Sequence, residues 1–251
     1  MWDINTNEGH IMTIRTGDAR FPSTKYKTSR HCIAYLDMLG GKNVICNDTQ
    51  SEHLNKINMI FYDALEESKM FAEDIFVKIF SDNILLTIPT DNDNREKNIE
   101  KIIVLVNNII SEMADYGYLM RGAITEGNFF SNNIIAYGKA LVEVVKLEEE
   151  CSIYPRVIAK KEIVELLPQY FYRCEDGWDM LNPYIFGIGS CDFINFRLTF
   201  LNQLKSNKNN EKIRQKIMWA INNFNTINNA MRRVGYFRSL ITRVDVEKAM
   251  E

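Results

Sequence analysis

Apolar and polar residues follow two different periods along this chain, and each period predicts one type of element. Apolar side chains at helical spacing predict two long helices, at residues 51–71 and 95–116. Short apolar runs predict strands at residues 31–39, 74–80, 84–88 and 119–124. The turn Ser81-Asp82-Asn83 predicts a hairpin between two of these runs, and Pro89 ends the second strand of that hairpin.

In chain order these elements read strand, helix, strand, strand, helix, strand, which is typical of a ferredoxin-like α+β fold. In that fold a mainly antiparallel sheet carries both helices on one face. Further along, the pattern predicts a strand pair (Leu119–Ile124 and Asn128–Tyr137), a helix at about 139–150 and a short strand Arg156–Ala159. The last third predicts a C-terminal hairpin around Asp176-Gly177 and helices at about 193–206 and 210–232.

No Pro-, Gly- or Ser-rich stretch and no run of like charges divides the chain, so we expect one domain. Residues 1–30 are polar, show no sustained period and are expected to form an N-terminal arm. The core is expected over residues 31–170, and residues 171–251 are expected to be a C-terminal elaboration of the same domain.

The composition is that of a globular protein, since 46% of the 251 residues are hydrophobic and 25% are charged. A formal net charge of -3 provides no overall basic field, so we expect no nucleic-acid partner. The 5 cysteines lack CxxC spacing, and the chain shows no export signal and no apolar run of about 18 residues. These features predict a cytoplasmic protein with reduced thiols and no membrane span.

Two carboxylates occupy positions that local structure does not explain. Asp37 interrupts an apolar strand, and Asp82 lies in the hairpin turn after another apolar run. A buried carboxylate is costly unless it is paired or binds a cation, and two aspartates on neighbouring strands are a common site for Mg or Mn. The alternative is that Asp82 caps its turn and that Asp37 lies close to a solvated strand end.

Four segments of the chain carry a resemblance to a known family. They are DMLGGK (Asp37–Lys42), KIFSDNI (Lys78–Ile84), MRGAITEG (Met120–Gly127) and YGKALVEVVKLEEE (Tyr137–Glu150). In order and spacing they are similar to the motif blocks of class III nucleotidyl cyclase catalytic domains. The resemblance covers about residues 31–160 and implies a cyclase core with the ferredoxin-like fold.

Within that class the chain resembles the stand-alone bacterial cyclases of Pycsar antiphage defence, which make cyclic UMP or cyclic CMP. The narrower resemblance rests on the Tyr154-Pro155-Arg156 segment, on the DGW and NPY sequences near residues 176–184, and on a helix that carries Trp219 and Asn225. It implies an enzyme that makes a second messenger from UTP or CTP during phage infection. The choice between these two substrates stays open.

The resemblance assigns roles to individual residues of the expected core. Asp37 and Asp82 match the family's metal-binding aspartates, which hold two divalent ions, Mn or Mg, at each site. Met38 matches a residue whose backbone carbonyl also touches a metal. Arg121 matches an arginine that binds the triphosphate, a role that suits its permanent charge and forked donors. Without the resemblance, an arginine paired with an acid at a strand end would explain Arg121 equally well.

Three further positions match the family's base pocket. Tyr35 matches one of them, although a plain core tyrosine is the simpler explanation from the sequence alone. Lys78 stands where adenylyl cyclases place a base-reading lysine. Ile135 stands where purine cyclases place a second polar residue, and its side chain offers no hydrogen bond to a base edge. This combination favours a pyrimidine substrate, while the retained Lys78 leaves an adenylyl cyclase with an altered pocket as an alternative.

The chain departs from the family on the helix that steadies the transition state. The usual asparagine and arginine of that helix are replaced by Val142 and Lys146. Lys146 still supplies a positive charge, but Val142 cannot orient the ribose through a hydrogen bond. A second hypothesis is therefore a catalytically inactive cyclase-fold protein that binds nucleotides or acts as a scaffold.

The resemblance implies an intramolecular phosphoryl transfer. The ribose 3'-hydroxyl of a nucleoside triphosphate attacks the α-phosphate, and pyrophosphate leaves. In the family the active site is shared across a head-to-tail dimer, so the expected partner is a second copy of this chain. In such a homodimer Tyr35 and Asp37 of one protomer serve two different sites.

Overall fold

A computed structural model describes residues 26–67, 74–90, 93–132, 134–184, 190–233 and 240–251. The strands are β1 (Ser29–Met38), β2 (Phe76–Phe80), β3 (Asn83–Pro89), β4 (Met120–Ser131), β5 (Ala136–Tyr137), β6 (Val157–Ala159), β7 (Phe171–Arg173) and β8 (Asp179–Leu181). The helices are α1 (Gly41–Asn47), α2 (Glu52–Glu67), α4 (Arg95–Asp115), α5 (Lys139–Cys151), α6 (Lys161–Leu166), the 3-10 turn η1 (Pro168–Tyr170), α7 (Ser190–Ser206), α8 (Glu211–Arg233) and α9 (Arg243–Met250). The expected N-terminal arm lies outside the described residues, except for residues 26–30.

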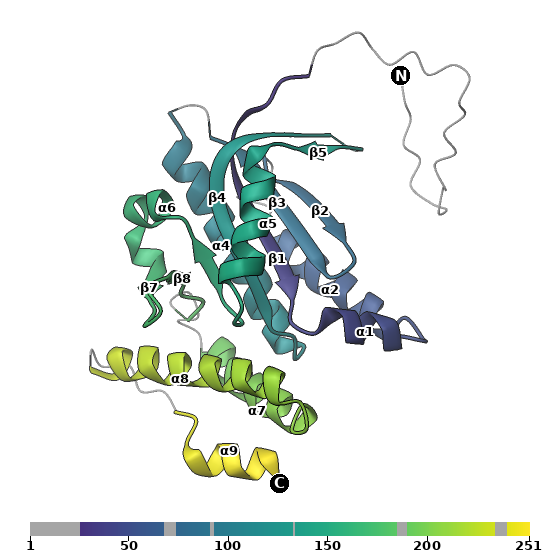
Figure 1. The fold of residues 1–251 in the computed structure, drawn as a ribbon, viewed down its shortest axis with the longest axis vertical. Helices are drawn as coiled ribbons and strands as arrows, with labels where there is room; N and C mark the ends of the chain where they lie inside the picture. Colours follow the sequence, from purple (N-terminus) through teal and green to yellow (C-terminus); the bar gives the residue numbers. More distant parts are fainter. Residues whose placement is uncertain (1–25, 68–73, 91–92, 133, 185–189, 234–239) are drawn as a thin grey trace.

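The described strands form one sheet in the order β2-β3-β1-β4-β6-β8-β7, with β5 paired to the far end of β4 (Figure 1). Within this sheet only the pair β4 and β6 is parallel. The segment β2-β3-β1-β4, with α2 and α4 connecting its strands, is the expected ferredoxin-like βαββαβ core. The α+β class and the mainly antiparallel sheet predicted from the sequence are therefore confirmed.

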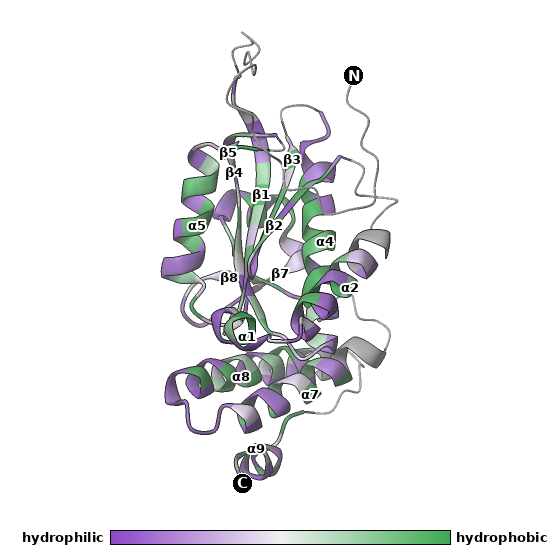
Figure 2. Ribbon diagram, turned by 90° about the vertical axis from the view of Figure 1, so that its right-hand side faces the viewer, coloured by the Kyte–Doolittle hydropathy of each residue, from purple (hydrophilic) through white to green (hydrophobic). Residues whose placement is uncertain are grey.

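Different helices cover the two faces of the sheet (Figure 2). Ile60 of α2 and Ile103 of α4 join Leu36 of β1 in the larger core, on one face. Ala140 of α5 joins Ile33 of β1 in a smaller core, on the other face. Because successive strand residues point to opposite faces, the odd-numbered residues of β1 lie on the face that α5 covers. This face carries the site described below.

The structure differs from the sequence-based expectation after residue 119. The expected strand pair Leu119–Ile124 and Asn128–Tyr137 is instead one long strand, β4, followed by the very short β5. Gly127, in the gap between the two predicted strands, lies within β4, and a Cβ atom added there would come within 3.2 Å of the Cβ of Ala140. The glycine therefore allows α5 to approach the strand closely, and it does not turn the chain.

Short helices were also missed by the sequence pattern, namely α1, α6 and α9. Each has 8 residues or fewer, which is too short to display a helical period. Gly117 caps the end of α4: its φ is 86°, and its N–H donates to the carbonyl of Ala114 over 2.9 Å.

The C-terminal elaboration shares the larger core with the rest of the chain. The side chain of Gln203 on α7 donates a hydrogen bond of 2.7 Å to the carbonyl of Gly117 at the end of α4. Tyr184 packs edge-to-face against Phe196 of α7 and Phe224 of α8. Figure 1 shows α8 lying across the end of the sheet toward which β1 points. The last third of the chain therefore closes one end of the sheet.

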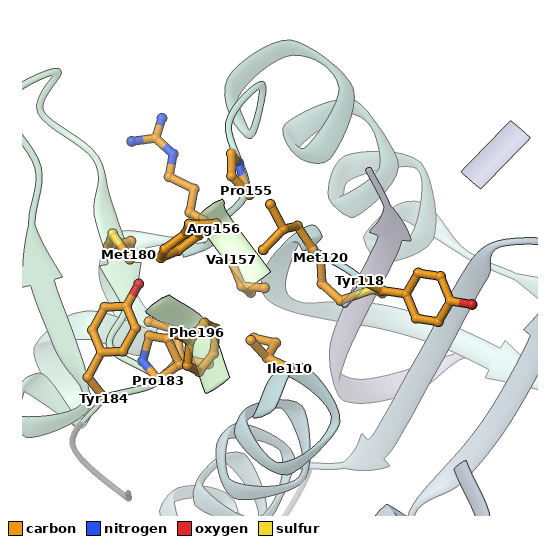
Figure 3. A pocket seen from close by; sticks show the side chains of 13 residues that line it. Ile110, Tyr118, Met120, Pro155, Arg156, Val157, Met180, Pro183, Tyr184 and Phe196 are labelled. Carbon is orange, nitrogen blue, oxygen red and sulfur yellow. The ribbon is translucent and has the colours of Figure 1, made fainter. Parts of the chain in front are cut away.

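A small apolar cavity lies where the C-terminal part meets the sheet (Figure 3). Met120, Met180 and Phe196 are among its lining residues, and its volume is about 20 Å³. Such a volume holds about one water molecule, so the cavity is not a ligand site. The stem of Arg156 lines it, while the guanidinium group points away from it.

None of the helices in the described part of the chain is both long enough and apolar enough to cross a lipid bilayer. The cysteines whose side chains are described carry free thiols, and they are Cys32, Cys46, Cys151 and Cys174.

Candidate active site

The predicted site residues Asp37 and Arg121 meet in one row across the sheet. Asp37, near the end of β1, pairs with Asn83 of β3 on one side and with Arg121 of β4 on the other. Directly paired residues of antiparallel strands point to the same face. Asp82 precedes Asn83 in the turn between β2 and β3. The register of the sheet therefore brings both aspartates and the arginine to one end of the same sheet.

Arg121 lies between two carboxylates. Its Nε and Nη2 atoms are 2.8 and 2.7 Å from Oδ2 of Asp37. Its Nε is also 2.9 Å from Oε1 of Glu148 on α5, whose side chain is only 3% exposed. The hydrogen bond to Asp37 orients the guanidinium, while the contact with Glu148 is an ion pair without a hydrogen bond. Arg121 therefore has one carboxylate partner on a strand and a second on a helix.

Burial makes the carboxylates of this cluster harder to ionise. Desolvation raises the pKa of Glu148 to about 7, and Arg121 opposes this rise while Asp37 adds to it. Desolvation also raises the pKa of Asp37, where Arg121 lowers it and the nearby Asp82 raises it. Lys216 of α8 interacts with the same charges, and its pKa is lowered by burial and by Arg121. An additional cation beside Asp37 and Glu148 would lower the pKa of both carboxyl groups.

Asp82 is positioned by the two glycines that follow β1. The backbone N–H of Met38 donates to the carbonyl of Asp82 over 3.2 Å, which joins the end of β1 to the hairpin turn. Gly40 has a φ of 80°, a left-handed conformation that turns the chain into α1. A Cβ atom added to Gly41 would lie 2.2 Å from Oδ2 of Asp82. Gly41 therefore provides the space that the Asp82 carboxylate occupies.

The oxygens of Asp37 and Asp82 suit a hard divalent cation. Among the described residues there is no group of three or more His, Cys, Asp and Glu side chains that could hold a metal ion. Two carboxylates are nevertheless the usual protein contribution to a Mg site, where water and substrate phosphates supply the other ligands. The chemistry of this pair therefore fits the predicted metal ions.

The predicted base-pocket residues Tyr35 and Lys78 lie one row further along the same face. Lys78 of β2 pairs with Leu85 of β3, which in turn pairs with Tyr35 of β1. The hydroxyl of Tyr35 donates a hydrogen bond of 2.6 Å to Oδ1 of Asn83. Burial, together with nearby carboxylates that include Asp37, raises the pKa of Tyr35 to about 12, so its hydroxyl remains a donor at neutral pH. In one protomer, then, Tyr35 lies beside the row that carries Asp37.

Three other residues singled out from the sequence lie apart from this cluster. Ile135, just before β5, is 48% exposed, and Val142 on the outer surface of α5 is 69% exposed. Lys146 is also largely exposed, and its Nζ is 3.9 Å from Oε1 of Glu150 on the same helix. Within the described part of one protomer, therefore, none of these three residues lies next to Asp37.

Sequence analysis missed two charged residues of this cluster, Glu148 and Lys216. Glu148 follows Ala140 and Val144 at intervals of four on the buried side of α5. A carboxylate on an apolar helical stripe is a readable signal, and it could have been noticed. Lys216 carries no such signal, because it comes close to Asp37 only when α8 packs across the end of the sheet.

Replacing Gly41 by alanine is expected to disturb Asp82 directly. The added methyl group overlaps the Asp82 carboxylate, so that side chain must move away from its present position. We expect the concentration of Mn needed for half-maximal nucleotide binding to rise by about tenfold or more, as for the loss of one good metal contact. Titration of Mn against binding of a fluorescent nucleotide measures this. Lys42→Ala, at the exposed next position, is the control, and equal behaviour of the two variants would contradict the role of Gly41.

The similarity of this chain to known proteins lies in its fold. No protein-family model and no curated protein matches the sequence. The guanylyl cyclase domain of the RhoGC fusion protein from the aquatic fungus Blastocladiella emersonii, in its monomeric crystal structure, matches with a TM-score of 0.51 and 9% identity over 62% of this chain and 96% of that chain. The guanylate cyclase domain of RhGC from Catenaria anguillulae has a TM-score of 0.49 and 9% identity over 62% and 96% of the two chains. The adenylyl cyclase CyaB from P. aeruginosa has a TM-score of 0.47 and 9% identity over 63% and 96%.

The first of these likenesses shows the fold of this protein. The chain has the fold of a nucleotidyl cyclase domain, built on the β1-to-β4 core described above. The cyclase fold that the sequence resemblance implied is therefore confirmed. The pyrimidine-specific, antiphage subtype stays a prediction.

Proposed function

We propose that this protein is a nucleotidyl cyclase that converts a pyrimidine nucleoside triphosphate, UTP or CTP, into the 3',5'-cyclic monophosphate and pyrophosphate. The observation that carries the proposal is the convergence of Asp37, Asp82 and Arg121 at one end of a cyclase-fold sheet. Each comes from a different strand or turn, and the register of the sheet brings them together.

In the proposed reaction the 3'-oxygen of the ribose forms a bond to the α-phosphorus. The bond from that phosphorus to the oxygen bridging to the β-phosphate breaks, the hydroxyl proton is released and pyrophosphate leaves. Arg121 would meet phosphate oxygens with its forked donors, and Glu148 lies beside it as a second counter-charge. Asp37 and Asp82 would hold Mn or Mg, two ions per site, which would supply charge neutralisation at the phosphates and acidify the attacking hydroxyl.

A homodimer with shared active sites is part of the proposal. Four exposed apolar side chains lie close together in the sequence on or beside β5 and the start of α5, each at least 48% exposed: Ile134, Ile135, Tyr137 and Val142. Exposed apolar residues of this kind are common at protein interfaces. A second protomer would cover this surface, and its Ile135 and Lys146 would then face the nucleotide bound at Asp37.

Pyrimidine specificity and a role in antiphage defence are also proposed. The apolar Ile135 supports the first, because it offers no hydrogen bond to a purine edge. The resemblance to the Pycsar cyclases supports the second.

The proposal is tested by incubating the purified protein with ATP, GTP, CTP and UTP separately in Mn and identifying products by mass spectrometry. A 3',5'-cyclic pyrimidine nucleotide that disappears with Asp82→Ala is the expected result. The matched control is Asp93→Ala, an exposed aspartate outside the cluster, which should leave the yield unchanged. A cyclic purine product would contradict the specificity.

One observation favours a second function, that of a nucleotide-binding protein without turnover. Arg121 is already bound by Asp37 and Glu148, and Val142 cannot orient a ribose. A folded dimer that binds UTP but yields no cyclic product from any of the four nucleotides would support this second function.

A further inference from the structure

A second feature of the same end of the molecule is a basic cavity between α8 and the turn at Tyr154. The cavity is an open surface hollow with a volume of about 510 Å³, and it is lined by Lys212, Lys216, Arg214, Gln215, Tyr154 and Trp219, among others. It differs from the small apolar cavity of Figure 3, which lies inside the core.

The lining of this cavity is basic. None of its described lining residues is Asp or Glu, and within the described part of the chain neither Lys212 nor Lys216 has a carboxylate at ion-pair distance, although Asp37 and Glu148 are near enough to interact with the charge of Lys216. Lys212 and Lys216 are four residues apart, so they lie on the same side of α8 and repel each other. A multiply charged anion in the cavity would relieve that repulsion.

The turn that carries Tyr154 packs against α8. Trp219 lies three residues after Lys216 and stacks on Tyr154, with ring centroids 4.3 Å apart and planes inclined by 5°. The guanidinium of Arg156 lies 4.9 Å from the centroid of the Trp219 ring and is held by Asp176 over 2.9 and 2.6 Å. The turn and the helix are therefore fixed relative to each other before any ligand binds.

Lys216 connects this cavity to the candidate active site. Its side chain is half-buried, and its charge interacts with those of Arg121, Asp37 and Glu148. Figure 1 shows why: α8 crosses the end of the sheet where β1 and α5 both end. An anion held by Lys212 and Lys216 would therefore lie next to the place where phosphate would meet Arg121.

We propose that the cavity lined by Lys212, Lys216 and Trp219 is a polyphosphate-binding site. The source of the polyphosphate rests on the proposed function: it is either the triphosphate tail of the nucleotide or the pyrophosphate released from it. Binding of the anion itself does not depend on turnover.

Isothermal titration calorimetry of the full-length protein with inorganic pyrophosphate, in EDTA so that no metal contributes, tests the site. Lys212→Gln/Lys216→Gln is expected to bind pyrophosphate about tenfold more weakly or worse, since two charged contacts are lost. The charge-matched control Lys161→Gln/Lys205→Gln removes two lysines outside the cavity and should bind like the unaltered protein.

Equal weakening in the test and control variants would overturn the proposal, because it would show a general charge effect. Binding unchanged by Lys212→Gln/Lys216→Gln, or no binding by the unaltered protein, would overturn it as well. A parallel titration with UTP identifies the source: weakened UTP binding in the test variant indicates the triphosphate tail, and weakening confined to pyrophosphate indicates the product. If the protein makes no cyclic nucleotide but binds pyrophosphate through these lysines, the proposed function is contradicted and the polyphosphate-binding site is supported.

Discussion

Arg121→Met is expected to lower the free energy of unfolding by about 3 to 5 kcal/mol at pH 8, the usual cost of removing one partner from a buried charge cluster. It leaves two carboxylates without their common partner, and the side chains of Asp37 and Glu148 are only 15% and 3% exposed. Chemical denaturation at pH 8 measures the loss. The control is Arg243→Met, whose ion pair with Glu247 is on the surface and should contribute less than about 1 kcal/mol.

The loss in the free energy of unfolding caused by Arg121→Met is expected to depend on pH. Glu148 titrates at about 4.5 when unperturbed and at about 7 in the folded protein, so folding is favoured by its protonated form. Stability from this group is complete below pH 4.5 and is lost as the pH rises through 7. Without Arg121 both carboxyl pKa values rise further, so the deficit of Arg121→Met at pH 5 should be smaller by at least about 1 kcal/mol than at pH 8.

A double variant separates the structural part of this effect from the functional part. Arg121→Met/Glu148→Gln removes one of the buried charges, so it should recover part of the stability lost at pH 8. It should not recover turnover, which the proposed function expects to fall about a hundredfold or more without the arginine. A double variant that is no more stable than Arg121→Met at pH 8 would show that the Glu148 carboxylate does not need Arg121 as its counter-charge.

Asp176→Asn is the second substitution with a large expected effect, a loss of about 2 to 4 kcal/mol in the free energy of unfolding. The side chain of Arg156 is 1% exposed, and Asp176 is its only carboxylate partner among the described residues. The carbonyl of Cys151, 3.0 Å from Nη2, remains but carries no full charge. The guanidinium would therefore stay buried without a counter-charge.

The deficit of Asp176→Asn is expected to shrink in acid. The Arg156 guanidinium lowers the pKa of Asp176 below its ordinary value of 3.8, so the pair contributes fully above that pH and is lost as the pH falls through the lowered value. Asp179→Asn is the matched control, because its partner Arg173 is 66% exposed and the pair should contribute less than about 1 kcal/mol. Equal losses in the two variants, measured by urea denaturation, would contradict the importance of the buried guanidinium.

Much of the fold was predictable because it depends on neighbouring residues. The helical stripe of residues 95–116 became α4, and the hairpin around Asp82 became β2 and β3. The expected break between the two strands around Gly127 was wrong. The close packing of α5 against β4 explains the glycine, and the residues next to it in the sequence do not indicate that contact. Local pattern could not distinguish a glycine that turns the chain from one that admits a helix.

The candidate site was predictable only in part, for a similar reason. Asp37 and Asp82 stood out because charge is unexpected at those positions, and the structure does bring their segments together through the Met38–Asp82 backbone contact. Glu148 was readable as a carboxylate on an apolar stripe, yet only the structure pairs it with Arg121. No pattern indicated that Asp176 would neutralise Arg156.

The sequence by itself determined the order and type of the main elements, together with the motif segments that resemble a nucleotidyl cyclase, because both are properties of residues close together in the chain. Only the tertiary structure decided which charges act on one another. Arg121, Glu148 and Lys216 belong to β4, α5 and α8, and their interaction depends on α5 covering one sheet face and on α8 crossing the sheet end. Electrostatic interaction depends on distance through space and on burial, and both exist only once the chain has packed.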